Sequence, residues 1–418
     1  MFPSNRTRRQ AVVSWAKTII LFGFVSALAA TIGPGFPLSL QATDFPDFYC
    51  AARMLADGHG HQLYDAVLQR QYQARYAARV GTLYIHPPFE AVLYLSVAWL
   101  PLRRAYWLWS LINLAFLALA ARRLAGEALP PWDWRLLFVA SLTFVPVLFC
   151  LIQGQDSLLL LLVLILALTA LRRSRAFAAG CWLGLGLFKF QLILPLALVL
   201  IVSYGKGSRA RLVEGFGLVA LALGGLSAAI SGWSVFLTYP QFLMHLHAQP
   251  FAGIVPEAMA NFRGLIYFFF HRDQSPWAIA AVSILSAAAL SKTLTYWRRS
   301  RLAAYRDPEA PRSEEFDRAF ASAILFALLV SYHLNPHDLS LLLLPIALLL
   351  HHTLARPRRE LHPADRVTPA LLAILFLPPL HVWTLRADAY ALVAMPLLLL
   401  FLNSSPCIAR RNNTAPVE

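Results

Sequence analysis

The chain has 418 residues, of which 58% are hydrophobic and only 14% charged, and its formal net charge is +15. A soluble domain of ordinary composition is about a quarter charged, so these values exclude an ordinary soluble protein and indicate a membrane protein. The positive charge does not indicate nucleic-acid binding, because the basic residues gather at the ends of apolar segments and form no basic face with exposed aromatics. The basic runs lie within residues 6–9, 172–175, 206–211, 298–301, 356–359 and 410–411.

The first apolar segment, residues 13–32, follows a basic N-terminus. It is longer than the apolar region of a typical signal peptide, so we predict an uncleaved first helix and a cytoplasmic N-terminus. Residues 33–85 contain no long apolar run. They predict a first extracytoplasmic loop on the membrane surface that forms half of a site. Within it, residues 48–79 predict one or two amphipathic helices broken at Gly58 and Gly60.

Further apolar segments follow in close succession. A helix that crosses a bilayer needs about 20 mostly apolar residues, and its backbone groups must be satisfied internally. We therefore predict an all-α polytopic membrane protein with about 11–13 transmembrane helices. After the first span, the predicted segments are 89–100, 106–121, 136–152, 158–171, 177–204, 212–230, 277–296, 320–332, 339–351, 367–385 and 390–402.

The predicted helices belong to one transmembrane domain, residues 1–404, with a second long loop over residues 231–262. Residues 405–418 are expected to form a disordered cytoplasmic tail. Strict alternation of the spans places the basic run 172–175 outside unless one earlier short segment is re-entrant, so the orientation of residues 103–175 stays open. The sequence contains neither an internal repeat nor a soluble domain.

The four cysteines are far apart and form no CxxC motif, so neither a metal site nor a disulfide framework is expected. They are Cys50, Cys150, Cys181 and Cys407. The compartment cannot be read from them.

Two carboxylates follow the first apolar segment, Asp44 and Asp47. A carboxylate at the membrane boundary can act as a general base if it reaches the proton that it accepts. Either residue can instead cap the helix that starts near Phe48, and Asp47 fits that role well.

Polar residues also interrupt the apolar segments. His86 either contacts an anionic ligand or only precedes the prolines that start the next helix. Gln155, in Gly154-Gln155-Asp156, marks either a polar cavity or a simple turn. Lys189 lies inside an apolar segment, where we expect it to face a cavity or an anion, with snorkelling to the membrane surface as the alternative.

Two polar segments complete the candidates. His333 and His337, between two apolar helices, can bind phosphate or polarise a hydroxyl; with Asp338 they also suggest a metal site, but the proline between them favours a turn. Asn261 and Arg263 end the second long loop, and arginine is suited to phosphate, with an interfacial anchor as the alternative. Together the candidates suit a lipid-phosphate substrate whose phosphate lies at the membrane surface.

The order and spacing of several motifs resemble those of a known family. The motifs are Asp44 with Phe48-Tyr49-Cys50-Ala51-Ala52; Gly58 with Tyr64-Asp65; His86-Pro87-Pro88; Pro101-Leu102 before Tyr106-Trp107-Leu108-Trp109 and Asn113; Gly154-Gln155; Ala179-Gly180 with Gly184, Gly186 and Lys189; and, loosely, His333 and His337. Over roughly residues 44–350 the chain resembles glycosyltransferase family 87, the polyprenyl-phosphate-mannose-dependent mannosyltransferase-like proteins of the multi-span GT-C class. It departs from them where His86 replaces an aromatic residue and where an Asn-Gln-Ser-like turn is reduced to Asn261-Phe262-Arg263.

The resemblance implies a GT-C-like bundle that transfers a hexose, usually mannose, from a polyprenyl-phosphate sugar to a glycolipid or glycan acceptor. The transfer inverts the anomeric centre on the extracytoplasmic face of the cell (inner) membrane, and it requires no nucleotide or other cofactor and implies no metal. We expect Asp44 to be the general base, and the expected substrate-binding residues are Lys189, Arg263, His333, His337, His86, Gln155, Tyr49 and Asn261. The alternatives are a transporter or flippase of a lipid-linked or anionic substrate, although no two related halves are found, and a non-catalytic membrane scaffold.

Overall fold

The computed structural model describes residues 40, 43–78, 81–128, 132–246, 253–304, 314–355 and 363–404. The regular elements in these ranges are all helices, and several are long and apolar enough to cross a membrane. The predicted all-α polytopic architecture is therefore confirmed. The predicted first span and the C-terminal tail lie outside the described residues.

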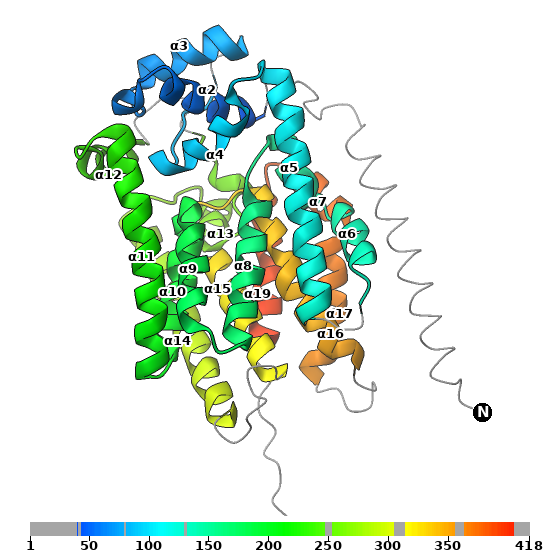
Figure 1. Ribbon diagram of the computed structural model, residues 1–418. Helices are drawn as coiled ribbons and strands as arrows, with labels where there is room; N and C mark the ends of the chain where they lie inside the picture. Colours follow the sequence, from blue (N-terminus) through cyan, green and yellow to red (C-terminus); the bar gives the residue numbers. More distant parts are fainter. Residues whose placement is uncertain are drawn as a thin grey trace, which may run out of the picture.

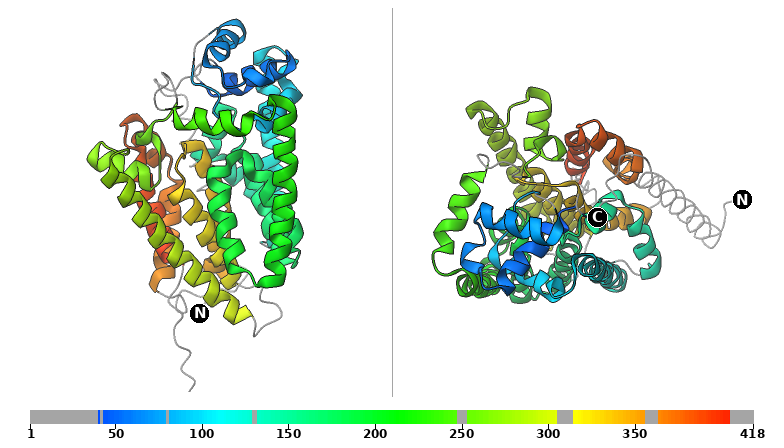
Figure 2. Two further views of the ribbon diagram at one scale, coloured as in Figure 1. Left: turned by 90° about the vertical axis from the view of Figure 1, so that its left-hand side faces the viewer. Right: turned by 90° about the horizontal axis from the view of Figure 1, so that it is seen from above.

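The helices form a bundle with a smaller cap across one end (Figures 1 and 2). The cap contains α2 (Phe45–Ala56), η2 (Gly60–Gln62), α3 (Ala66–Ala77) and α4 (Pro88–Ala98), and α12 (Val235–Met244) lies beside it. The bundle and its connections contain α5 (Leu102–Arg123), η3 (Leu124–Ala128), α6 (Trp134–Leu142), α7 (Val145–Gln153), α8 (Ser157–Arg172), α9 (Ala176–Leu185), η4 (Gly186–Lys189), α10 (Phe190–Ser203), α11 (Lys206–Ser231), η6 (Pro256–Ala258), α13 (Phe262–Phe270), α14 (Pro276–Ala304), α15 (Glu314–Val330), η8 (Pro336–Leu342), α16 (Leu343–Ala355), α17 (Pro363–Phe376), α18 (Pro378–Arg386), η10 (Tyr390–Val393) and α19 (Ala394–Asn403).

The cap has the helix break that the sequence predicts. Gly58 has φ +83°, a left-handed conformation that glycine adopts readily, and it separates α2 from η2. The Asp65 carboxylate then accepts hydrogen bonds from the backbone N–H groups of Val67 and Leu68 and so caps α3. Two short helices therefore replace one continuous helix across residues 48–79.

Helix α4 belongs to the cap, although residues 89–100 were predicted to form a span. Its eleven residues measure only about 16 Å, roughly half of a bilayer core. Both of its ends contact α2, because His86, just before α4, packs on Phe48 and the carbonyl of Ala98 accepts a hydrogen bond from Arg53. The chain therefore enters α5 on the same side of the bundle as the cap.

Residues 176–203 fold back on themselves instead of crossing the bundle. At one end, Arg172 of the preceding α8 pairs with Asp317 at the start of α15. At the other end, Tyr204 packs on Trp297, which packs against Phe316, so both ends reach the start of α15.

The middle of this segment lies at the opposite end of α15. Lys189 contacts Asp338, which follows α15 in the sequence, whereas the 17 residues of α15 separate the two ends by about 25 Å. We therefore describe α9–η4–α10 as a re-entrant hairpin with Lys189 near its tip.

The hairpin and the position of α4 bring the predicted basic runs together. Residues 172–175 precede the hairpin, residues 206–211 follow it, and Arg298 lies beside Trp297. All three therefore lie at the end of the bundle opposite the cap (Figure 1). The charge pattern placed residues 172–175 outside unless one earlier short segment was re-entrant, and α4 is such a short segment, which lies in the cap instead of crossing the bundle.

Within the described residues, five helices pass the length and hydropathy criteria for a span, or seven if the bent pairs α6–α7 and α17–α18 each count as one. These numbers lie below the predicted total of about 11–13 helices. The difference arises partly because some predicted segments form shorter helices and because the first predicted span lies outside the described residues. The 28 residues of the hairpin are among the five, since hydropathy cannot reveal a reversal of direction.

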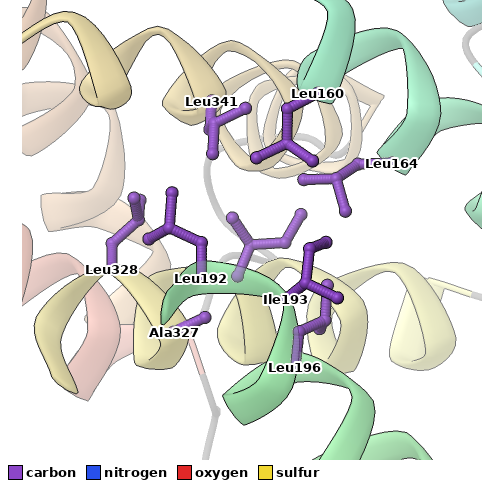
Figure 3. Close-up of a pocket in the computed structure, with 9 residues that line it drawn as sticks. Leu160, Leu164, Leu192, Ile193, Leu196, Ala327, Leu328 and Leu341 are labelled. Atoms are coloured by element: carbon purple, nitrogen blue, oxygen red, sulfur yellow. The ribbon is translucent and has the colours of Figure 1, made fainter. Parts of the chain in front are cut away.

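The core beneath the hairpin tip is aliphatic, and small residues allow helices to approach closely. Side chains of α8, α10, α15 and η8 line a small apolar pocket there (Figure 3), namely Leu160, Leu164, Leu192, Ile193, Leu196, Ile324, Ala327, Leu328 and Leu341. Beside them, α9 packs on α11 so tightly that a Cβ atom at Gly180 would lie 2.1 Å from the Leu212 carbonyl oxygen. The tip therefore rests on an apolar, closely packed base.

Single-cysteine labelling tests the re-entrant hairpin. In a chain without its native cysteines, Ser174→Cys and Gly207→Cys flank the hairpin, and Val67→Cys lies in the cap; all three positions are exposed. In sealed vesicles of known orientation, an impermeant maleimide should label the first two from one side and the third from the other. Labelling of positions 174 and 207 from opposite sides would show that residues 176–203 cross the membrane.

Candidate active site

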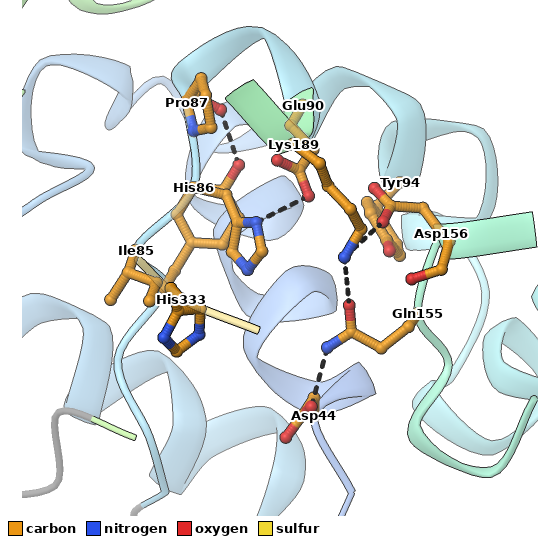
Figure 4. Close-up of polar contacts among 12 residues, drawn as sticks. Asp44, Ile85, His86, Pro87, Glu90, Tyr94, Gln155, Asp156, Lys189 and His333 are labelled. Atoms are coloured by element: carbon orange, nitrogen blue, oxygen red, sulfur yellow. Dashed lines mark hydrogen bonds and ion pairs between the residues drawn. The ribbon is translucent and has the colours of Figure 1, made fainter. Parts of the chain in front are cut away.

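A polar cluster lies where the cap meets the bundle (Figure 4). The cap contributes Asp44, His86 and Glu90, and the hairpin contributes Lys189. The turn between α7 and α8 contributes Gln155 and Asp156, and the residues between α15 and α16 contribute His333 and Asp338. Most of the predicted site residues, which are far apart in the sequence, therefore gather in one place.

Lys189 forms two buried ion pairs. Its Nζ lies 2.9 Å from Asp338 Oδ1 and 3.3 Å from Asp156 Oδ1, and all three side chains are at most 2% exposed. The hydroxyl of Ser157 also donates to Asp338, at 2.9 Å. Burial of an unpaired charge is costly, so these carboxylates are what allow the ammonium group to lie here. Lys189 faces anions, as expected for an intramembrane lysine, but the anions belong to the protein.

Asp44 is held by the turn that joins α7 to α8. The side-chain amide of Gln155 donates to Asp44 Oδ2 at 2.7 Å, and the backbone N–H of Asp44 donates to Gln153 Oε1 at 2.9 Å. Between the two glutamines, Gly154 has φ +66°, and a Cβ atom there would lie 2.6 Å from Phe45. Only glycine suits this turn, which holds both the backbone and the carboxylate of Asp44.

The two candidate aspartates have different roles. Asp44 occupies the N-cap position of α2, but its carboxylate makes no capping hydrogen bond. Asp47, the residue expected to fit the cap, instead lies buried in the first turn and accepts hydrogen bonds from Gln73 and Thr82. Asp47 therefore joins α2 to α3 and to the residues after α3. The expectation that Asp47 is the N-cap of α2 is wrong.

His86 and Glu90 form a pair at the start of α4. His86 Nδ1 lies 3.0 Å from Glu90 Oε1, and the glutamate side chain is fully buried. Burial first, and then the positive charge of Lys189, lowers the pKa of His86 to about 4. His86 is therefore neutral at pH 7, and one of its ring nitrogens faces Glu90.

The predicted polar turn before α16 is confirmed. Asn335 and Asp338 form a reciprocal capping box that starts η8, and Pro336 occupies its first turn. His333 lies within hydrogen-bonding range of Asn335, and His337 lies 3.6 Å from Asp338. Burial lowers the pKa of His333 to about 4, so this side chain is also neutral at pH 7.

Asn261 and Arg263 join α13 to the same turn. The Asn261 side chain caps α13 through the Gly264 N–H and donates to the Ser331 carbonyl at 2.7 Å. Arg263 pairs with Asp273 and lies over the Tyr332 ring, 4.1 Å from its centroid. Both residues therefore contact the segment just before His333. The charge of Arg263 is paired with that of Asp273.

Tyr49 points away from the cluster. Its hydroxyl donates to the Leu100 carbonyl at 2.8 Å, and its ring lies near Tyr76. Tyr49 therefore packs the cap against the α4–α5 turn and is not brought together with the other predicted site residues.

Two residues that contact the cluster were not among those predicted from the sequence. Glu90 is a single acidic residue near the start of an apolar segment, and that isolation was the available signal. Gln153 immediately precedes a Gly-Gln pair that was itself recognised. The hydrogen bond that its side-chain oxygen accepts from the distant Asp44 backbone N–H cannot be read from the local sequence.

One comparison with known proteins gave a match. The model of glycosyltransferase family 87 matches residues 84–310, which is more than half of the 418 residues. The chain belongs to glycosyltransferase family 87. It is thus a membrane glycosyltransferase, which uses a sugar donor and an acceptor. Comparisons with curated proteins and with solved structures found no match.

The matched residues cover part of the cluster. They contain His86, Glu90, Gln155, Asp156 and Lys189, whereas Asp44 and the histidines after α15 lie outside them. Any role assigned to Asp44 therefore rests on the geometry of the site and not on the family match.

The two neutral histidines predict a pH dependence of stability. The pKa of each histidine is about 4 in the folded protein, whereas the ordinary value of 6.5 applies to the unfolded chain. Between these pH values the unfolded chain therefore binds more protons. Folding stability should fall as the pH drops from about 6.5 to about 4, by up to about 3 kcal/mol for each histidine. Thermal unfolding in detergent would measure this, and the double variant His86→Gln, His333→Gln should show a shallower decline. An equal decline in both proteins would contradict the prediction.

Proposed function

We propose that this membrane glycosyltransferase transfers a hexose, mannose in the first instance, from a polyprenyl-phosphate sugar to a hydroxyl of a glycolipid or glycan. The observation that carries the proposal is the held, half-buried carboxylate of Asp44 at the junction of cap and bundle. Acceptor activation requires a base that is both fixed and reachable, and the hydrogen bonds and partial exposure of Asp44 support this role.

In the proposed reaction, Asp44 accepts the proton of the acceptor hydroxyl as its oxygen attacks the anomeric carbon. The new bond joins that oxygen to the anomeric carbon while the bond from the anomeric carbon to the phosphate oxygen breaks. The lipid phosphate leaves with the electron pair, and attack from the opposite face inverts the anomeric centre. Because the sugar arrives already linked to the phosphate of the lipid, the reaction requires no nucleotide.

The donor phosphate requires hydrogen-bond donors that are not already committed to carboxylates. Lys189 and Arg263 both have carboxylate partners within the protein. His86 and His333 are better candidates, because a neutral imidazole offers an N–H, and a nearby phosphate favours the protonated ring. Burial raises the pKa of Glu90 to about 8, so this side chain is mostly protonated at pH 7 and can donate to His86 Nδ1, which leaves the other ring nitrogen to carry the N–H for the phosphate. In this proposal the histidines bind the donor phosphate in place of the cations Lys189 and Arg263.

The distribution of charge supports an extracytoplasmic site. The basic runs before and after the hairpin lie opposite the cap, and such runs favour the cytoplasmic side of a membrane. The cap and the polar cluster would then face outward in the cell (inner) membrane. Lipid-linked sugars displayed on that face would reach the cluster from the bilayer.

An Asp44→Asn variant tests the base. Loss of a general base typically costs 10²–10⁴-fold in rate, so we expect a loss of about that size in transfer from polyprenyl-phosphate hexose to an acceptor extract. Asp65→Asn is the matched control, because it removes an exposed cap carboxylate while asparagine still caps a helix. A folded Asp44→Asn protein with full activity would refute the assignment. Movement of the lipid across the membrane without transfer would refute the enzymatic proposal.

Donor titrations test the histidines. His86→Asn and His333→Asn should raise KM for the lipid-phosphate sugar by roughly tenfold, because the shorter asparagine amide cannot place a donor where the outer ring nitrogen of histidine lies and cannot become protonated beside the phosphate. Exposed His61, also in the cap, provides the control variant His61→Asn, which should leave KM unchanged. An unchanged donor KM in both site variants would place the phosphate elsewhere.

A further inference from the structure

A chain of three polar side chains connects the hairpin to Asp44 (Figure 4). Lys189 Nζ lies 3.5 Å from Gln155 Oε1, which is a long contact. On the other side of the same amide, Gln155 Nε2 lies 2.7 Å from Asp44 Oδ2. The amide of Gln155 therefore stands between a cation and the proposed base.

The chemistry of these groups fixes the direction of the amide. A side-chain amide has an acceptor oxygen at one end and a donor nitrogen at the other, and it can be reversed by rotation. An ammonium group only donates, so Lys189 requires the Gln155 oxygen to face it. The amide nitrogen must then face Asp44, where it donates to the carboxylate. A hydrogen bond to the charged form of an acid favours that form.

The position of the ammonium group is itself determined by ion pairs. Asp156 and Asp338 hold Lys189 from two sides, and Ser157 donates to Asp338. These contacts occupy the lysine with carboxylates and leave it poorly suited to a substrate phosphate. The same contacts fix the ammonium group of Lys189 in place, so that it can hold the Gln155 amide in one orientation.

We propose that Lys189 and Gln155 are positioning residues that keep Asp44 ionised and aimed at the acceptor, by locking the donor end of the Gln155 amide onto its carboxylate. This inference rests on the proposed function, because it assumes that Asp44 accepts the acceptor proton. It assigns Lys189 and Gln155 an effect on the base in place of the direct substrate contact expected from the sequence.

Other titratable groups of the cluster can also affect the ionisation of Asp44. They come from the cap, from the start of α8, from the hairpin and from the turn before α16, and they are His86, Glu90, Asp156, Lys189, His333, His337 and Asp338. The test must therefore change the Gln155 bond without changing any of these charges. Substitution of an uncharged glutamine meets that requirement.

The experiment compares Gln155→Leu with Gln153→Leu across a pH series of transfer rates. Both variants remove one glutamine from the same turn, but only Gln155 contacts the carboxylate, whereas Gln153 contacts the Asp44 backbone N–H. Without its amide donor, Asp44 should protonate more easily. The acidic limb of the rate profile should therefore move up by about one pH unit in Gln155→Leu, and activity should recover as the pH rises. Gln153→Leu should keep the wild-type midpoint.

A second variant examines the cation. Lys189→Met frees the amide to reverse and should move the same limb in the same direction. If this variant does not fold, the Gln155 and Gln153 pair still decides the question. An unmoved limb in Gln155→Leu, or an equal movement in Gln153→Leu, would overturn the inference.

The outcome for Asp44→Asn separates the two proposals. If Asp44→Asn is inactive and the limb of Gln155→Leu is unmoved, only the positioning role fails. If Asp44→Asn remains fully active, the base assignment fails and the positioning role fails with it.

Discussion

The buried pairing of Lys189 with two carboxylates is the interaction on which the site depends. It connects the tip of the hairpin to the start of α8 through Asp156 and to η8 through Asp338. No one of these segments could bury its charge alone at an acceptable free energy, so each requires the other two. The same lysine then faces Gln155, and Gln155 faces Asp44, so the packing of the bundle determines the position of a cap residue.

The cap is joined to the bundle by directional bonds as well as by apolar contact. The turn after α7 holds Asp44 at two points, while Trp109 and Tyr94 donate hydrogen bonds to the carbonyl of Gly154 in that turn. These bonds satisfy backbone groups that would be costly to bury unpaired. They also place the polar cluster above an aliphatic core, where electrostatic interactions are stronger than in water.

Much of this arrangement was predictable, because polar residues in apolar surroundings are informative. Asp44, His86, Gln155, Lys189 and His333 were each recognised by residue type and position, and the helical membrane architecture followed from composition. Their pairings were not predictable. Lys189 and Asp338 are far apart in the chain, and nothing local to either residue indicates the other. Tyr49 was included through the family resemblance alone, and its contacts place it outside the cluster.

Direction was the other property that hydropathy could not supply. The apolar segment 177–204 looks like a single span whose only irregularity lies at Lys189 and Gln191, and that irregularity is where the chain reverses. The short apolar segment 89–100 gives a similar signal yet forms a cap helix, because its contacts with α2 decide its position. For segment 89–100 the charge pattern was the better guide, since it placed residues 172–175 outside unless one earlier short segment failed to cross.

The hairpin also has a consequence for biosynthesis. Lys189 leaves the ribosome after Asp156 but well before Asp338, so the nascent chain must accommodate the ammonium group with only one of its two final counterions. Because both ends of the hairpin lie at the same end of the bundle, its flanking segments do not hold its tip at the other end. The burial of Lys189 is therefore complete only once η8 has been made, so the second half of the chain completes a charged contact of the first.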